Sequence, residues 1–149
     1  GLDRIQDRPV ETVSLPSPFD FERQALLCIP ADIAAPDSPN FLDEVVDHCR
    51  EILTITGGHA FVLFTSFYAL DRVHSRLEGF LKDRGIVALK QGQAGRSELL
   101  DRFRSAESAV LFGTDSFWEG VDVAGPKLQC VILARLPFRV PTEPIHEAR

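Results

Sequence analysis

The residues best suited to chemistry lie in one short run, residues 113–122. The run follows four apolar residues, 109–112, which are typical of a strand that is buried on both faces. Its polar side chains therefore come directly after a strand, where open α/β sheets bind their ligands. These residues are Gly113, Thr114, Asp115, Ser116, Glu119, Gly120 and Asp122. A turn with Phe117 and Trp118 folded onto the core would have the same composition, so the run alone leaves both interpretations open.

Three carboxylates in this run suggest one kind of site. Asp115, Glu119 and Asp122 could form the metal-binding or acid–base cluster of a small α/β hydrolase. Other familiar site motifs are missing from the sequence, which contains no G-x-x-x-x-G-K-S/T phosphate loop, no G-x-G-x-x-G and no G-x-S-x-G. The chain therefore has no evident means of hydrolysing a nucleotide by itself.

Length and composition predict a single globular domain. The 149 residues are 44% hydrophobic, and no apolar run approaches the ~20 residues of a membrane span. The net charge of −6 argues against bulk electrostatic binding of nucleic acid, so a bound strand must be held by local contacts. Since the N-terminus does not resemble a signal peptide, we expect a cytoplasmic protein with no membrane partner.

Cysteines and histidines do not indicate a metal site. The three cysteines are widely spaced among apolar neighbours, which predicts small buried thiols. The four histidines lack the spacing of metal ligands and are expected to be structural. These residues are Cys28, Cys49 and Cys130, and His48, His59, His74 and His146.

Apolar periodicity predicts alternating strands and helices. Strands are expected at residues 25–29, 60–64, 86–89, 109–112 and 128–136, and helices at residues 39–53, between Ser66 and Gly85, and after Gly95. Ser38 is expected to cap the first helix. Residues 1–18 form a polar lead-in, in which Val13 and Leu15 hint at a short edge strand. The expected fold is an α/β domain with a mainly parallel sheet of about five strands and helices on both faces.

In such a sheet, polar residues from separate parts of the chain converge. All strands of a parallel sheet end at the same edge, so the residues that follow them are expected to gather there. They are Thr65 and Ser66, Gln91 and Gly92, Gly113 and Thr114, and Arg135. Hydroxyl or amide side chains beside main-chain N–H groups suit phosphate oxygens, which predicts a phosphate-lined groove.

Several motifs in this chain resemble those of a known family. Residues 113–125 read GTDSFWEGVDVAG, residues 130–138 read CVILARLPF and residues 141–144 read PTEP. The runs SPFDF at 17–21, AFVLFTSF at 60–67 and KQG at 90–92 precede them in the family's order. Together they resemble the second, C-terminal RecA-like motor domain of the DinG/XPD-like branch of superfamily 2 helicases.

The resemblance implies a three-layer RecA-like fold and a role for each motif. In that family, two RecA-like domains clamp ATP and move 5′ to 3′ along single-stranded DNA. Contacts with DNA are then expected at Thr65, Ser66, Gln91, Gly92, Thr114 and Ser116. Nucleotide contacts are expected at Glu119, Gly120 and Asp122, with Asp122 near the ribose.

The same resemblance implies what this chain lacks. The phosphate loop, the Asp-Glu box and any iron–sulfur cluster belong to the family's first motor domain, which would bind ATP and Mg²⁺ together with this one. The sixth motif, which brings an arginine to the γ-phosphate of ATP, would follow residues 128–136, but the chain ends first. Residues 1–149 are therefore expected to be an inactive fragment of a DNA repair helicase, with no catalytic or metal-binding residue of its own. Gln93–Arg96 superficially imitates the sixth motif, but it precedes the family's fifth motif, which the resemblance places at residues 114–122, and is expected to be a loop leading into a helix. A helicase-derived interaction module without activity remains an alternative.

Overall fold

The computed structural model describes residues 13–123 and 125–137, which form two units divided after Ala31. In the first unit, residues 13–31 are all exposed and contain one short helix, α1, Phe21–Gln24. The second unit, from Asp32 onward, contains the sheet and the longer helices. The PTEP run, His146 and most of the predicted lead-in lie outside the described residues.

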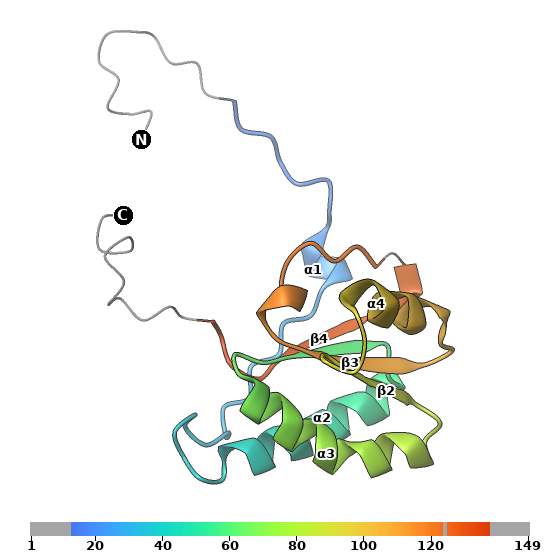
Figure 1. Ribbon diagram of the computed structural model, residues 1–149. Coiled ribbons are helices and arrows are strands. Elements are labelled where there is room, and N and C mark those ends of the chain that lie inside the picture. The colour runs from blue at the N-terminus through green and yellow to red at the C-terminus, as the bar shows by residue number, and fades with distance from the viewer. Residues whose placement is uncertain (1–12, 124, 138–149) are drawn as a thin grey trace, which may run out of the picture. The chain divides into compact units, whose positions relative to one another are not determined.

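The second unit is built on a sheet of four parallel strands in the order β2-β3-β1-β4 (Figure 1). These strands are β1, Ala60–Leu63; β2, Val87–Lys90; β3, Ala109–Gly113; and β4, Cys130–Leu133. Every residue of the two central strands, β1 and β3, is buried. Continuous apolar runs predicted this double coverage, because each face of a parallel sheet is packed by helices. The edge strands β2 and β4 are more exposed.

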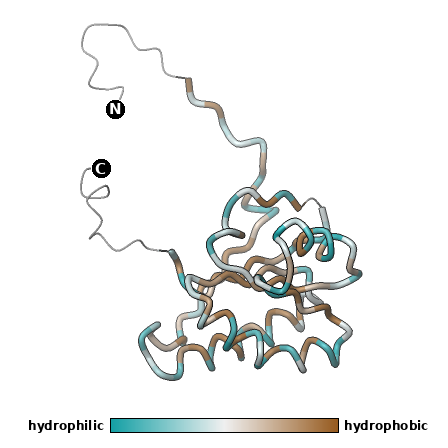
Figure 2. Tube along the Cα trace, in the orientation of Figure 1, coloured by the Kyte–Doolittle hydropathy of each residue, from teal (hydrophilic) through white to brown (hydrophobic). Residues whose placement is uncertain are grey.

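Three helices cover the two faces of this sheet. Helices α2, Phe41–Thr56, and α3, Phe67–Asp83, pack on one face, and α4, Arg96–Ser105, packs on the other (Figure 1). Apolar residues are concentrated in the strands and recur along the helices (Figure 2). The predicted α/β fold with a mainly parallel sheet between helical layers is confirmed. None of the helices in the described part of the chain is long and apolar enough to cross a membrane.

The strand count differs from the prediction of about five, since residues 13–123 and 125–137 contain four strands. Residues 25–29, predicted as the first buried strand, pair with none of them, and Leu26 is 88% exposed. Val13 and Leu15 are likewise exposed and form no strand. An apolar run becomes a strand only where a neighbour can accept and donate its main-chain hydrogen bonds. The last strand is also shorter than predicted and covers Cys130–Leu133.

Burial of the thiols follows the packing of their elements. Cys49 on α2 is completely buried, and desolvation raises its pKa to about 12. Cys28 is exposed, which corrects the prediction that all three cysteines are buried. The difference arises because Cys28 belongs to the run that joins no sheet. Cys130 on the edge strand β4 is intermediate.

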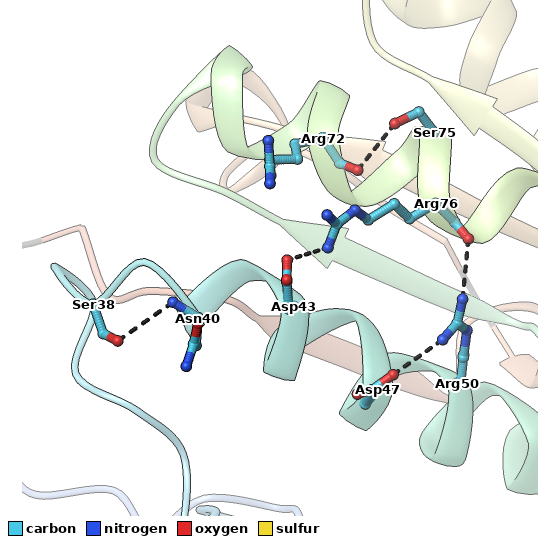
Figure 3. Close-up of polar contacts among 8 residues, drawn as sticks. All are labelled: Ser38, Asn40, Asp43, Asp47, Arg50, Arg72, Ser75 and Arg76. Carbon is cyan, nitrogen blue, oxygen red and sulfur yellow. Dashed lines mark hydrogen bonds and ion pairs between the residues drawn. The ribbon is translucent and has the colours of Figure 1, made fainter.

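The helix starts show where the sequence signals were right and where they were displaced. Helix α2 begins at Phe41, after Asn40, rather than at Pro39. The Ser38 hydroxyl accepts a hydrogen bond from the Asn40 N–H at 3.4 Å, just before the helix (Figure 3). At α3 the cap is where the sequence predicts a helix start, since the Ser66 hydroxyl accepts from the Ala69 N–H at 3.3 Å.

Polar contacts join α2 to α3 on their exposed sides (Figure 3). Asp43 of α2 forms an ion pair with Arg76 of α3. The Arg50 guanidinium donates to the Arg76 carbonyl oxygen at 3.4 Å and pairs with Asp47 at 3.0 Å. Exposed ion pairs of this kind contribute at most about 1 kcal/mol each, so the packing of the two helices depends mainly on their apolar faces.

The core consists of two clusters, one on each face of the sheet. The first packs α2 and α3 against inward residues of β1 and β3, such as Val62 and Phe112. His74 of α3 belongs to this face, with its ring edge-on to Phe112 at 5.1 Å between centroids, and burial lowers its pKa. The second cluster packs α4 against the opposite face and includes Phe117 from the loop after β3. That loop is therefore anchored in the core.

We expect Gly113→Ala to lower the free energy of unfolding by about 1–3 kcal/mol, because the added methyl group overpacks the core. A Cβ at Gly113 would lie 2.9 Å from Cδ2 of Phe117, whose side chain is buried and cannot move aside easily. Gly79→Ala is the matched control, since a Cβ there meets no atom within 4 Å and alanine favours the helix by about 0.5–1 kcal/mol. Urea unfolding of the domain measures both; equal stabilities for Gly113→Ala and the parent would contradict this account.

Candidate nucleic-acid and nucleotide site

The ends of all four strands meet at one edge of the sheet. Leu63 of β1 lies opposite Gly113 of β3 and Leu133 of β4, and Lys90 of β2 lies opposite Phe112 of β3. The predicted polar residues follow directly: Thr65 and Ser66 after β1, Gln91 and Gly92 after β2, Thr114 after β3, and Arg135 after β4. The structure thus brings them to a common edge, although they are far apart in sequence.

Gln91 and Thr114 contact each other directly. The Gln91 Oε1 atom accepts hydrogen bonds from the Thr114 N–H at 2.6 Å and from the Thr114 hydroxyl at 3.1 Å. The Gln91 N–H in turn donates to the Phe112 carbonyl oxygen at 2.9 Å. Thr114 is buried, so its polar groups hold the turn after β2 rather than facing solvent. Gly92, next in that turn, is exposed and has a φ of 95°.

A cavity lies beside Thr65 and Ser66. Its volume is about 450 Å³, and it is lined by residues from the loop before α2, the start of α2, the start of α3 and the end of β4. The lining residues with polar side chains are Ser38, Thr65, Ser66, Tyr68, Arg72 and Arg135. Two arginines beside four hydroxyl groups suit an anion such as a phosphate.

Sequence reasoning missed Tyr68 and Arg72. They stand four residues apart on α3, and therefore on the same side of the helix, in the two turns that follow Ser66. This spacing is the signal that could have found them. In Figure 3, the hydrogen bond drawn at Arg72 is donated by the Ser75 hydroxyl to the Arg72 main-chain oxygen, at 3.0 Å. It does not involve the Arg72 guanidinium group.

The loop after β3 combines a buried anchor with exposed polar residues. It starts with a 3₁₀ helix, Asp115–Phe117, whose last residue is buried in the α4 cluster. Trp118 is partly buried and packs on the same cluster, so it contributes to core packing. Glu119 and Asp122 are exposed, and Gly120 between them has a φ of 63°, in the left-handed region that favours glycine. Ser116 is also exposed.

The three carboxylates of this loop do not form a cluster. Among the residues described by the structure, no three His, Cys, Asp or Glu side chains are grouped so that they could hold a metal ion. Asp115, Glu119 and Asp122 are therefore spread along the loop. The alternative of an acidic hydrolase site gains no support from their arrangement.

Comparison with known proteins identifies the family of this chain. Residues 49–149 match the helicase C-terminal domain family. The chain is 38% identical over 146 residues to the ATP-dependent DNA helicase YoaA of Escherichia coli. The aligned region covers 98% of this chain and 22% of that relative. It is 34% identical over 143 residues to a Bacillus subtilis protein named 3′-5′ exonuclease DinG, covering 93% of this chain and 15% of the relative.

A third relative is the ATP-dependent helicase DinG of Mycobacterium tuberculosis, 31% identical over 145 residues, with 96% of this chain and 21% of the relative covered. The chain thus spans between 15% and 22% of the length of these three relatives. The match of residues 49–149 includes all four described strands, α3, α4 and the loop after β3, together with part of α2. This chain belongs to the helicase C-terminal domain family.

Proposed function

We propose that this domain is the second motor domain of an ATP-dependent DNA helicase that moves 5′ to 3′ along single-stranded DNA. It supplies half of the ATP cleft and part of the DNA track. The observation that carries the proposal is the gathering of polar strand ends at one sheet edge, beside a cavity with two arginines. Membership of the helicase C-terminal domain family supports it.

On the DNA side, Thr65 and Ser66 face the sugar-phosphate chain together with Arg72 and Arg135. Arginine and hydroxyl groups bind phosphate oxygens without reading bases, as a motor that moves along any sequence requires. These four residues around one cavity provide local contacts to phosphates. Such contacts are needed because the chain has a net charge of −6 and cannot bind DNA by bulk electrostatics.

The track continues along the edge through the turns after β2 and β3. Gly92 and Ser116 are exposed and offer main-chain and hydroxyl groups to the DNA. Gln91 and Thr114 act as a pair, because their mutual hydrogen bonds fix the turn that carries Gly92.

On the nucleotide side, Glu119, Gly120 and Asp122 line the ATP cleft. An exposed carboxylate such as that of Asp122 suits the hydroxyl groups of a ribose, and Gly120 leaves room for close approach of the main chain. The first motor domain of the full-length protein holds the triphosphate and Mg²⁺, and any iron–sulfur cluster belongs to that domain. We place the protein in the cytoplasm, where it acts in DNA repair.

The full-length protein that carries this domain is expected to unwind a duplex with a 5′ single-stranded tail and to hydrolyse ATP faster when single-stranded DNA is added. The double variant Arg72→Ala, Arg135→Ala is expected to bind single-stranded DNA about tenfold more weakly, because two phosphate contacts are lost. Its plot of log K against log salt should be less steep by about 1.4, since each contact with a single strand contributes about 0.7.

Fluorescence anisotropy with a labelled oligonucleotide at several salt concentrations measures these changes. Arg84→Ala is the control, because Arg84 is an exposed arginine stacked on Phe80 at the far end of α3. Equal binding by the double variant and the parent would exclude this cavity from the track. A full-length protein whose ATPase ignores single-stranded DNA would refute the motor function itself.

A further inference from the structure

One arginine holds most of the loop after β3. Arg96 is the first residue of α4, and its guanidinium donates to three main-chain carbonyl oxygens of that loop. Nε lies 3.0 Å from the oxygen of Ser116, and Nη2 lies 2.9 Å from the oxygens of both Glu119 and Gly120. Only arginine has a planar fork of donors that can bind several acceptors in fixed directions. Arg96 therefore ties together both ends of the 116–120 segment.

The loop depends on side chains for its shape in this region. Between Thr114 and Val123, the last main-chain hydrogen bond that a loop N–H group donates to another described residue is that of Trp118, whose N–H donates to the Asp115 oxygen at 3.1 Å. From Glu119 to Asp122, the loop is held by Arg96, by packing of Val121 on the α4 cluster, and by Arg104 of the same helix, which donates to the Asp122 oxygen at 2.7 Å. The conformation of the proposed nucleotide-binding residues is therefore set by α4.

Arg96 also directly follows the turn after β2, which comprises residues 91–95. That turn is closed by the Gln93 N–H, which donates to the Lys90 oxygen at 3.1 Å, and by the Lys90 N–H, which donates to Gln93 Oε1 at 3.0 Å. It is joined to the loop after β3 at both of its ends, through Gln91 to Thr114 and through Arg96 to the 116–120 segment. We therefore expect a displacement of this turn to be passed to the loop through these hydrogen bonds.

We propose that Arg96 is a positioning residue that couples DNA bound at the turn after β2 to the geometry of the nucleotide-binding loop. This inference rests on the proposed function, which places DNA at Gly92 and ATP at Glu119 and Asp122. Arg96 touches neither ligand: its donors point at carbonyl oxygens of its own domain. Because coupling between two binding sites is reciprocal, each ligand must change the affinity for the other by the same factor, and loss of Arg96 must lower both effects equally.

The test uses the full-length protein with Arg96→Ala, Arg96→Lys and Arg102→Ala. Arg102 is an exposed arginine of the same helix, so its removal changes the charge of α4 equally without touching the loop contacts. For Arg96→Ala we expect kcat/KM for ATP in the presence of single-stranded DNA to fall about tenfold, as for the loss of hydrogen bonds from a charged donor. The affinity for DNA without nucleotide should stay within about twofold of the parent. Lysine, a single point donor, should restore only part of the coupling.

Binding measurements then separate coupling from general damage. We expect a non-hydrolysable ATP analogue to strengthen DNA binding in the parent and in Arg102→Ala, but much less in Arg96→Ala, with the same loss seen for DNA acting on the analogue. Unchanged coupling in Arg96→Ala, or equal loss of ATPase activity with and without DNA, would overturn the proposal. Should Arg96→Ala fail to fold, Arg96→Lys decides in the same way: coupling equal to that of the parent overturns it. A parent protein without DNA-stimulated ATPase would instead refute the proposed function.

Discussion

The domain on its own is expected not to hydrolyse ATP, with turnover at the level of the buffer blank. Phosphoryl transfer requires a lysine and Mg²⁺ at the phosphates and an arginine at the γ-phosphate, and the arginine alone is worth about 10³–10⁵-fold in rate. The sequence contains no phosphate loop, and Arg96, which superficially resembles the arginine of a sixth motif, is bound to the loop after β3. Steady-state phosphate release by the purified domain measures this.

The control for that experiment is the full-length protein with single-stranded DNA, which should turn over ATP under the same conditions. Circular dichroism of the isolated domain verifies that an inactive sample is folded. Robust turnover that persists through purification and disappears in Asp122→Ala would show that the domain has a complete active site. That result would overturn its assignment as half of a two-domain motor.

Asp122→Ala in the full-length protein is expected to slow unwinding by about 10–100-fold at ATP concentrations below KM, because a charged acceptor proposed to bind the nucleotide is lost. The fold should remain intact. The Asp122 side chain is exposed, and its main-chain oxygen stays bound to Arg104 whatever the side chain is. The effect should appear mainly in KM for ATP, since the ribose contact is made in the ground state as well as in the transition state.

Asp83→Ala provides the matched control for Asp122→Ala. Asp83 is an exposed carboxylate at the last position of α3, near the opposite edge of the sheet, where β2 begins. Unwinding assays on a 5′-tailed duplex, together with thermal melting, compare the two variants. If Asp122→Ala unwinds DNA at the rate of the parent when ATP is below KM, Asp122 does not belong to the nucleotide site.

The sequence predicted the central part of the fold well, because the signals there are local and strong. β1 and β3 are continuous apolar runs, which are typical of strands that are covered on both faces. The start of α3 was equally clear, since Ser66 caps the helix directly after a strand. Order of elements and parallel pairing together determine which edge carries the polar residues.

What the sequence could not predict depends on partners that are distant along the chain. Residues 25–29 are as apolar as β1, yet they pair with none of the four strands, and composition cannot reveal whether a neighbour is available. The start of α2 was displaced by two residues for a local reason instead: the Ser38 hydroxyl accepts from the Asn40 N–H, before the helix begins.

The candidate site shows the same division. Its position at the strand ends followed from topology, whereas the pairing of its side chains did not. Thr114 was expected to offer free polar groups, but both are bound by Gln91, 23 residues earlier. Two further residues belong to the site region through tertiary contacts: Arg96 binds the loop after β3, and Arg72 lines the cavity beside Ser66.

The strand order β2-β3-β1-β4 also constrains the route of any long ligand across this domain. Because β3 separates β2 from β1, the turn at Gln91 and the turn at Thr65 are two strand spacings apart, about 10 Å. A polymer that touches both must pass over the first residues that follow β3. Under the proposed function, the phosphates of a bound single strand would therefore pass over the residues directly after β3, which lead to the proposed nucleotide-binding residues.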